Sequence, residues 1–341
     1  MIARPLLSLL LISTLWTTPS LAAQAPSSFR DDPAVVEFAY QMAARHGFSA
    51  AELLRQFAQI KPNAKVLQLI KPPTTPTQRS WARYQPRFLN ERRIERGLQF
   101  WITHRETLEK AQQRFGVPVD IIVAIIGVET EYGRNTGGFR TLEALATLAF
   151  EYPPRADFFR TELEQFLLLS RENSLDPLQV KGSFAGAIGI PQFMPGSQRR
   201  YAVDFDGDAR IDLSQSAEDA IGSVGRFLEQ HGWRSGGRVA VPANVTQDIP
   251  ESVTDAGIRP TFTVAQLASH GIYRATEQTG QAAAEESEKA ALIDLVSPDQ
   301  ATEYWLGFDN FYVITRYNRS SFYAMAVFQL AEALRQRRNG E

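Results

Sequence analysis

The feature that most constrains this chain is an unbroken apolar run at residues 121–128 (IIVAIIGV), which leads directly into Glu129. Pro118 and Asp120 precede the run, and both residue types favour the first turn of a helix. A helix that is apolar on all sides is a buried one. The run therefore predicts a central helix around which a globular core packs.

Glu129 is the residue of this helix best suited to chemistry. Ile122, Ile125 and Glu129 share one helix face, so the sequence directs a carboxyl toward an apolar surface. Burial disfavours the charged form, which raises the carboxyl pKa and suits it to donate a proton near neutral pH. The alternative is that Glu129 and Glu131 only form the polar end of a helix that stops before Gly133.

Helical periodicity of apolar residues recurs along most of the chain. Ser49 and Glu52 have the spacing of a capping box at the start of one such segment. The expected helices are residues 33–46, 50–57, 90–114, 141–150, 156–170 and 321–338. Residues 71–77 (KPPTTPT) predict a linker, because prolines lack a backbone donor and restrict the residue before them.

The period changes to that of strands between residues 236 and 316. Turn-forming residues at 297–299 and 309–310 separate the stretches. The expected strands are residues 238–241, 290–296, 302–308 and 311–316. The polar segment 275–289 predicts a mobile loop or a short exposed helix. The pattern is that of a mainly α chain with a small β part.

The N-terminus predicts export. Residues 1–23 carry one charge, Arg4, followed by an apolar run over residues 5–16 and by small residues up to Ala23. This is the pattern of a cleaved signal peptide, with a retained N-terminal anchor as the alternative. We therefore expect a periplasmic protein.

Composition argues against several classes of site and partner. The chain has 36 Lys and Arg against 38 Asp and Glu, so it has no strong attraction to nucleic acid. It has no cysteine, which excludes disulfides, thiolate metal sites, cysteine nucleophiles and N-terminal lipidation on cysteine. The four histidines suggest no zinc site.

A second informative stretch is residues 181–197 (KGSFAGAIGIPQFMPGS). Its small residues let backbone approach a ligand closely, while Ser183 and Gln192 offer hydrogen bonds. It lacks a Lys-Ser/Thr ending and does not follow an expected strand, which argues against a phosphate-binding loop. The stretch predicts a cleft wall, with tight packing between helices as the alternative.

An acidic loop resembles the first part of an EF-hand. Asp204, Asp206, Asp208 and Asp212 fall at loop positions 1, 3, 5 and 9, and the carbonyl of Arg210 falls at position 7. Position 6 is alanine rather than glycine, and position 12 is glutamine rather than glutamate. The loop predicts a structural calcium ion, with a solvated acidic turn as the alternative.

Six motifs in order make the chain similar to the B-type lytic murein transglycosylases over nearly all of its mature length. They are residues 128–133 (VETEYG), 145–150 (LATLAF), 181–186 (KGSFAG), 192–195 (QFMP), 219–223 (DAIGS) and 311–318 (FYVITRYN). The resemblance implies an α+β fold in which a lysozyme-like catalytic core is flanked by a helical domain and a small antiparallel β domain. The expected boundaries are a signal peptide at 1–23, a helical domain at 24–115, the core at 116–235 with the EF-hand-like loop at 204–219, the β domain at 236–316, and a C-terminal helix at 317–341 that returns to the core.

The resemblance also implies roles for particular residues. Glu129 corresponds to the sole catalytic acid/base of the family, and calcium would be held by the acidic loop, closed by Asp219 or Glu218. Residues of the glycan-binding cleft would be Ser183, Gln192, Tyr317 and Asn318, with Tyr84, Tyr152, Arg155 and Phe158 further along it. Two positions depart from the pattern: Phe158 stands where some relatives have tyrosine, and Glu131 is not part of the motif, although at i+2 from Glu129 it is expected to face away.

The implied reaction is cleavage of the β-1,4 bond between N-acetylmuramic acid and N-acetylglucosamine, with 1,6-anhydromuramic acid ends and no catalytic cofactor. A single carboxyl fits a substrate-assisted route. One alternative is a hydrolytic muramidase, which needs a second carboxylate such as Asp157 or Glu131. The other is a non-catalytic peptidoglycan-binding protein. Expected partners are peptidoglycan glycan strands and proteins of cell-wall synthesis, with the chain itself a monomer.

Overall fold

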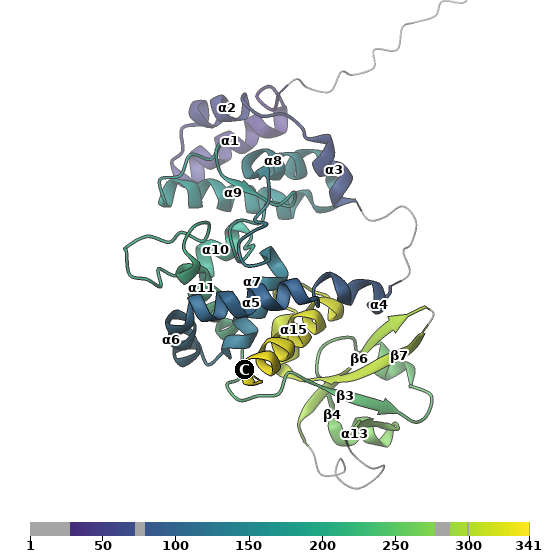
Figure 1. Cartoon of the computed structure of the whole chain (residues 1–341). Coiled ribbons are helices and arrows are strands. Elements are labelled where there is room, and N and C mark those ends of the chain that lie inside the picture. Colours follow the sequence, from purple (N-terminus) through teal and green to yellow (C-terminus); the bar gives the residue numbers. More distant parts are fainter. Residues whose placement is uncertain (1–27, 72–78, 277–286, 299, 341) are drawn as a thin grey trace, which may run out of the picture.

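The computed structural model describes residues 28–71, 79–276, 287–298 and 300–340, and it is mainly helical with one small sheet (Figure 1). An upper helical group lies above a central group of helices. The five-stranded sheet lies on the far side of the central group from the upper helices. Among the described residues no single helix is long and apolar enough to cross a membrane. The helices α6 (Arg105–Phe115) and α7 (Val119–Thr130) meet that criterion only together, as a pair bent by 113°.

The upper helical group joins segments that are far apart in the sequence. Side chains of its helices share one buried cluster with Phe29 and Ile188. Asp32 caps the first helix by accepting from the Ala34 amide, and Gly47 ends that helix in a left-handed conformation. The group comprises α1 (Pro33–His46), α2 (Ala50–Phe57), α3 (Ala64–Ile70), α8 (Thr141–Glu151), η2 (Pro153–Arg155) and α9 (Ala156–Glu172).

The central group is built around α7 (Val119–Thr130), in which every residue but Glu129 is buried. The chain enters this group through α4 (Trp81–Tyr84) and η1 (Gln85–Arg87). Four other helices pack against α7: α5 (Glu91–Thr103), α6 (Arg105–Phe115), α11 (Ala217–Gln230) and the C-terminal α15 (Ser321–Asn339). Burial of this all-apolar helix is a large favourable contribution to folding.

A two-stranded sheet and a small helix lie between the two groups. The strands β1 (Phe139–Arg140) and β2 (Lys181–Gly182) pair antiparallel, and β2 leads into the stretch at 181–197. The helix α10 (Pro195–Tyr201) contacts both α9 of the upper group and α11 of the central group. The small-residue stretch is therefore one of the connections between the groups.

The sheet is antiparallel throughout, with strand order β4-β6-β7-β3-β5. Its strands are β3 (Ala240–Val245), β4 (Phe262–Thr263), β5 (Ile272–Arg274), β6 (Lys289–Ser297) and β7 (Gln300–Gly307), and two short helices, α12 (Glu251–Thr254) and α13 (Val264–Ser269), accompany them. Alternate residues of β6 point to opposite faces. Ile293 and Leu295 belong to the central core, whereas Ala290 and Leu292 belong to a small cluster with Val264.

Most predicted elements are confirmed, and the fold class is the predicted one. The helices expected at 33–46, 50–57, 121–128, 141–150, 156–170 and 321–338 correspond to α1, α2, α7, α8, α9 and α15. The strands expected at 290–296 and 302–308 correspond to β6 and β7. The signal peptide at 1–23, the linker apart from Lys71, and all but five residues of segment 275–289 lie outside the described residues.

The strand predicted at 311–316 is wrong, because this segment is the helix α14 (Asp309–Ile314). Asn310 was interpreted as a turn residue, yet it lies in the first turn of this helix and is buried. Its side chain accepts from the Arg234 amide at 2.8 Å and donates to the carbonyls of Arg234 and Gly237. These bonds to a remote loop fix the start of the helix, and local sequence does not reveal them.

Two further boundaries differ from prediction. The single helix expected at 90–114 is broken at His104, whose φ of −109° and ψ of 28° end α5 before α6 begins. The imidazole of His104 packs on Phe100 and lies 3.2 Å from the carboxylate of Glu218, so a contact with α11 accompanies the bend. The strand expected at 238–241 runs instead from 240 to 245, through Pro242, which pairs with Trp305.

Candidate active site around Glu129

Glu129 lies in the last turn of α7 and retains some exposed surface there. The Tyr323 hydroxyl donates a hydrogen bond to its carboxylate, with 2.6 Å between the two oxygens. The ring of Tyr317 stacks on that of Tyr323 at 6.4 Å, and the Tyr317 hydroxyl donates to the Pro191 carbonyl at 2.7 Å. One end of α15 and the segment before it thus enclose the carboxyl.

Burial raises the pKa of Glu129, and the hydrogen bond from Tyr323 lowers it by a smaller amount. The net result is a pKa of about 7. The carboxyl therefore exchanges a proton near neutral pH, as a general acid/base requires. The pKa values of the nearby tyrosines are raised as well. Burial and the charge of Glu129 raise the pKa of Tyr84, Tyr317 and Tyr323, so their hydroxyls stay protonated and can donate.

Tyr323 is the main residue of this site that sequence reasoning missed. It falls in the predicted C-terminal helix, where Phe322, Met325 and Leu330 were assigned to the core. A signal was present, because Tyr323 adjoins this apolar face and a buried tyrosine needs a partner for its hydroxyl. Only the tertiary structure identifies that partner as Glu129.

The residues from the small-residue stretch form a wall beside Glu129. Thr130 donates from its hydroxyl to the Ile190 carbonyl at 2.8 Å, which ties the end of α7 to this wall. Gln192 adopts a left-handed backbone (φ 51°), and its amide nitrogen donates to the carbonyls of Thr136 and Gly189. Ser183 accepts from the Ala187 amide at 3.0 Å. Both residues therefore hold the wall in shape.

Several glycines of this wall are in tight contact with their neighbours. A Cβ on Gly189 would lie 2.5 Å from the Leu213 carbonyl oxygen, and one on Gly186 would overlap the side chain of Leu145. The alternative drawn from the sequence, tight packing, thus describes part of this stretch accurately.

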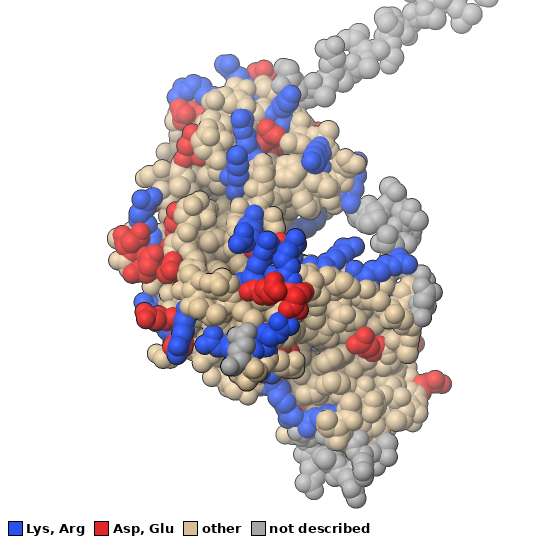
Figure 2. Space-filling view, viewed as in Figure 1, with Lys and Arg blue, Asp and Glu red and all other residues tan. Residues whose placement is uncertain are grey.

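The other predicted cleft residues divide between the two helical groups. Tyr84 packs against Phe88 and Phe322 in the central group and lies within the electrostatic influence of Glu129. Asn318 follows Tyr317 and is exposed. The surface is hollowed between the upper group and the level of α4 and α5, on the right in Figure 2.

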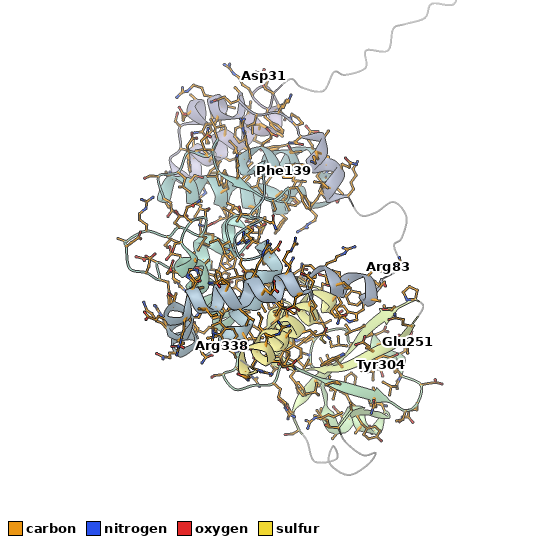
Figure 3. All side chains as sticks on the ribbon, in the orientation of Figure 1. Asp31, Arg83, Phe139, Glu251, Tyr304 and Arg338 are labelled. Atoms are coloured by element: carbon orange, nitrogen blue, oxygen red, sulfur yellow. The ribbon has the colours of Figure 1, made fainter. Side chains whose placement is uncertain are left out.

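Tyr152, Arg155 and Phe158 belong to the upper group. The Arg155 guanidinium lies 4.4 Å from the centre of the Phe158 ring, and Phe158 is 39% exposed. Tyr152 packs on the upper core. Figure 3 shows Phe139 among these upper helices and Arg83 on α4, on either side of the space between the groups.

Neither candidate for a second catalytic carboxylate is placed beside Glu129. The Asp157 side chain is fully exposed on α9 of the upper group. Glu131 is buried, but its carboxylate is engaged by Arg92 and Arg96 of α5. Neither acid contributes to the shift of the Glu129 pKa, which burial and Tyr323 determine.

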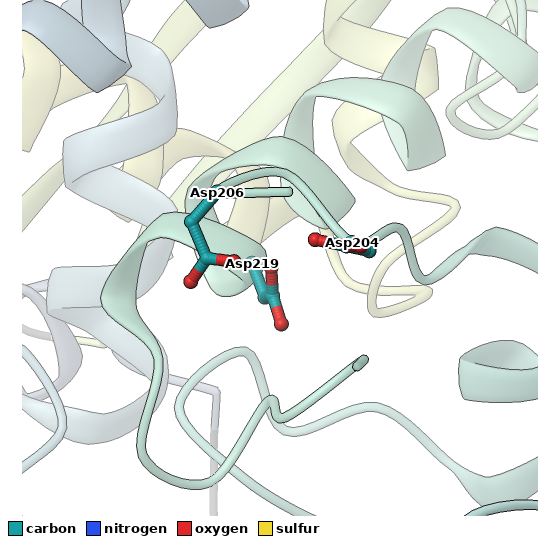
Figure 4. A group of neighbouring side chains, drawn as sticks. All are labelled: Asp204, Asp206 and Asp219. Atoms are coloured by element: carbon teal, nitrogen blue, oxygen red, sulfur yellow. The ribbon is translucent and has the colours of Figure 1, made fainter. Parts of the chain in front are cut away.

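The acidic loop brings together three of the acids predicted to bind metal (Figure 4). Carboxylate oxygens of Asp204, Asp206 and Asp219 lie within 4.8 Å of one another. Asp219 is only 1% exposed and accepts from the amides of Phe205 and Asp212. Three oxygen donors around one point, one of them a buried carboxylate, fit a hard cation. Asp208 and Arg210 are exposed, and the Asp208 carboxylate lies outside this cluster.

A cavity of about 830 Å³ lies away from Glu129, between the end of α9 and residues 209–215. It is lined by Glu172, Lys181, Gln198 and Leu213, among others. Its size is in the range of ligand sites. The carboxyl with the shifted pKa is not among its lining residues, so size alone does not identify the reactive centre.

Comparisons with known proteins all lead to transglycosylases. A family model described as the transglycosylase SLT domain matches residues 30–332. The chain is 42% identical over 323 residues to the membrane-bound lytic murein transglycosylase B of Escherichia coli, covering 91% of this chain and 85% of that protein.

Solved structures are similar over the same extent. The soluble lytic transglycosylase SltB1 from Pseudomonas aeruginosa has a TM-score of 0.82 at 45% identity, covering 90% of this chain and all of that one. The Escherichia coli lytic transglycosylase Slt35 in complex with calcium has a TM-score of 0.81 at 41% identity, with 91% and 95% covered. SltB3 from Pseudomonas aeruginosa, in complex with NAG-NAM-pentapeptide, has a TM-score of 0.75 at 28% identity, with 88% and 78% covered.

Proposed function

This chain belongs to the transglycosylase SLT domain family, and on that premise we propose that it is a peptidoglycan lytic transglycosylase whose single catalytic acid/base is Glu129. It cleaves the β-1,4 bond between N-acetylmuramic acid and N-acetylglucosamine and leaves 1,6-anhydromuramic acid ends. The observation that carries the assignment of Glu129 is its pKa of about 7 in a carboxyl enclosed by the α7, α15 and wall segments.

In the first step, protonated Glu129 gives its proton to the glycosidic oxygen as the bond from that oxygen to C1 of muramic acid breaks. The 2-acetamido oxygen of the same sugar forms a bond to C1, so the substrate supplies the nucleophile that a second carboxylate normally provides. The N-acetylglucosamine side departs as an alcohol. Glu129 is left as a carboxylate, which the Tyr323 hydroxyl stabilises by hydrogen bonding.

In the second step, the C6 hydroxyl of muramic acid attacks C1 and gives its proton to Glu129. The bond between C1 and the acetamido oxygen breaks, which restores the acetamido group and forms the 1,6-anhydro ring. One proton has been cycled and no water has been consumed. The protein's task is to orient the sugar and to exclude water from C1.

Hydrolysis is the less favoured outcome for this site. Ordinary glycoside hydrolysis uses a second carboxylate beside the acid. Here Glu131 is held by arginines, and Asp157 is fully exposed on the upper group. The products of hydrolysis exceed the anhydro products by the mass of one water. Mass spectrometry of muropeptides released from purified sacculi therefore separates the two reactions.

Glycan strands are expected to lie between the upper group and the central group. Tyr84, Tyr317, Gln192, Ser183 and Asn318 would contact sugars on the Glu129 side. On the upper side, Tyr152 and Phe158 would offer ring faces and Arg155 would meet carboxylates of muramic acid or stem peptides. The bound NAG-NAM-pentapeptide of the relative SltB3 supports this class of ligand.

The acidic loop would hold a structural calcium ion through Asp204, Asp206 and Asp219, and the calcium complex of the relative Slt35 supports this. Asp208 and the Arg210 carbonyl remain predicted ligands. The ion would neutralise clustered carboxylates and join residues 204–212 to the start of α11. It has no part in the proton transfers.

Export to the periplasm follows from the sequence of residues 1–23, with cleavage near Ala23 and no lipid anchor on cysteine. Sequencing the N-terminus of the mature protein tests this. Docking to proteins of cell-wall synthesis is a further proposal, tested by co-purification from crosslinked cells.

The central experiment replaces Glu129 with glutamine. The Glu129→Gln variant is expected to release no anhydro-muropeptides from sacculi while it still sediments with them. The exposed acid Asp157 offers a matched control, because Asp157→Asn should keep the parental rate. Undiminished release by Glu129→Gln would refute the assignment.

A further inference from the structure

The chain takes up a strained conformation directly after Glu129 and Thr130. Glu131 and Tyr132, neither of them glycine, both have left-handed backbones, with φ of 52° and 63°. A left-handed backbone costs such residues roughly 1–2 kcal/mol each. Strain of this kind persists only where surrounding contacts impose the conformation. The turn that follows α7 is therefore held from outside.

The carboxylate of Glu131 makes several of these contacts. It is only 6% exposed, and both of its oxygens are engaged. Arg96 donates to Oε1, and Arg92 Nε lies 3.1 Å from the same oxygen. The Asn135 amide nitrogen donates to Oε2 at 3.2 Å. One side chain thus joins the turn to α5 and to the residues beyond the turn.

The same face of α5 also holds the residues on both sides of Glu129. Arg93 donates to the Gly127 carbonyl and lies 3.5 Å from that of Val128, while its own carbonyl accepts from the Tyr132 hydroxyl at 3.0 Å. A Cβ on Gly97 would overlap that hydroxyl. The backbone at 127–128 and at 131–132 is therefore fixed relative to α5, with Glu129 between these two points.

We propose that Glu131 is a positioning residue for the reaction: by tying the turn after α7 to Arg92 and Arg96, it sets the direction in which Glu129 presents its carboxyl. The inference rests on the acid/base role proposed for Glu129. Glu131 acts through the backbone, because its carboxyl is bound on the α5 side of the turn. Misplacing a catalytic group by about 1 Å can cost on the order of a hundredfold in rate.

Two substitutions at this position separate positioning from simple stability. Glu131→Gln keeps the left-handed strain and part of the hydrogen bonding but loses the charge. Glu131→Gly removes the anchoring side chain, yet glycine adopts the left-handed backbone without strain. The kcat is expected to be highest in the parent, lower in Glu131→Gln and lowest in Glu131→Gly, where it falls at least about tenfold below the parent. The KM of both variants should stay within about twofold of the parental value. The expected Tm of Glu131→Gly is equal to or above that of Glu131→Gln.

Ser174 supplies a matched control, because it also has a left-handed backbone (φ 53°) at the end of a helix, α9. Ser174→Gly should keep the parental kcat and should not lower Tm. The proposal is overturned if Glu131→Gly retains the parental kcat, or if kcat follows Tm across the three residues at position 131. Activity in Glu129→Gln, measured on the same substrate as the position-131 variants, would instead remove the function proposed for Glu129.

Discussion

At the scale of single residues, Glu129 and Glu131 illustrate how environment assigns roles to identical side chains. The Glu129 carboxyl is surrounded by tyrosine hydroxyls and apolar groups, so burial raises its pKa to about 7. The Glu131 carboxylate, two residues later, is more deeply buried yet is paired with two arginines. One group is suited to exchange a proton, and the other to hold a turn.

The raised pKa of Glu129 makes stability depend on pH. A carboxyl with a pKa of about 7 when folded, against 4.5 when unfolded, binds its proton more tightly in the folded state. Its contribution is fully present below pH 4.5 and is lost as the pH rises through 7, by about 3 kcal/mol. Glu129→Gln does not titrate, so relative to the parent its free energy of unfolding should rise between pH 4.5 and 8.

Urea unfolding of both proteins across this range measures the difference. The acid Glu91 on α5, whose substitution to glutamine leaves Glu129 unchanged, is the control. A difference between Glu129→Gln and the parent that stays constant from pH 4.5 to 8 would contradict the assigned pKa.

Removing the Tyr323 hydroxyl should shift the pH dependence of activity. Its hydrogen bond stabilises the carboxylate, so Tyr323→Phe should raise the Glu129 pKa further. Loss of a bond to a charged group, worth roughly 1.5–3 kcal/mol, corresponds to about one to two pH units. The alkaline limb of kcat/KM should move to higher pH by that amount. Tyr312→Phe, on α14, should leave the limb in place, and a limb that moves to lower pH with Tyr323→Phe would reverse the argument.

The residues of the site were predictable to unequal degrees. Glu129 stood out because an acid at the end of an apolar helix is conspicuous, and the resemblance of residues 311–318 indicated Tyr317. Tyr323 was not singled out, because a tyrosine in a buried helix has no local sign of its partner. Asp208 fits the spacing of an EF-hand, yet the loop places its carboxylate outside the cluster of three acids.

At the scale of elements, the close crossing of α5 and α7 depends on glycine. A Cβ on Gly127 would lie 2.6 Å from the Tyr132 hydroxyl oxygen. Gly127→Ala should therefore displace the tyrosine, break its bond to the Arg93 carbonyl and destabilise the protein by roughly 1–3 kcal/mol. Gly138→Ala has open space around the added methyl and is the control. Equal free energies of unfolding for the two variants would show that α5 and α7 move apart to admit the added methyl at no cost.

Elements were predictable where burial alone determines them. The run at 121–128 has no polar face, and α7 is buried as expected. The segment at 311–316 could not be assigned in the same way, because its apolar residues fit a strand as well as a short helix. The bonds of Asn310 to the loop at 234–237 favour the helix, and they join residues far apart in sequence.

At the scale of the whole molecule, the acidic loop is well placed to affect overall stability. The Leu213 carbonyl accepts from the Ile190 amide at 2.7 Å, so the loop is bonded to the wall beside Glu129. Calcium at about 100 times its Kd should stabilise the folded state by about 2.7 kcal/mol and raise Tm. Asp219→Asn should abolish this calcium-dependent increment, whereas Asp157→Asn should retain it. An unchanged Tm of the parent in calcium, measured by calorimetry, would favour the solvated acidic turn.

The division into two helical groups was harder to foresee than the helices themselves. Helices α8 and α9 follow α7 in sequence but pack with α1, α2 and α3. Nothing in their periodicity specifies that partner, since an apolar face matches many others. The resemblance supplied the architecture as an expectation, and the structure supplies the contacts that produce it.

The partner of the reactive carboxyl comes from the last helix of the chain. Tyr323 is contributed by α15, which also packs along α7. A polypeptide still being synthesised would have Glu129 long before it had the hydroxyl that completes the proton-exchange site. The arrangement around Glu129 therefore exists only once the C-terminal helix has docked on α7.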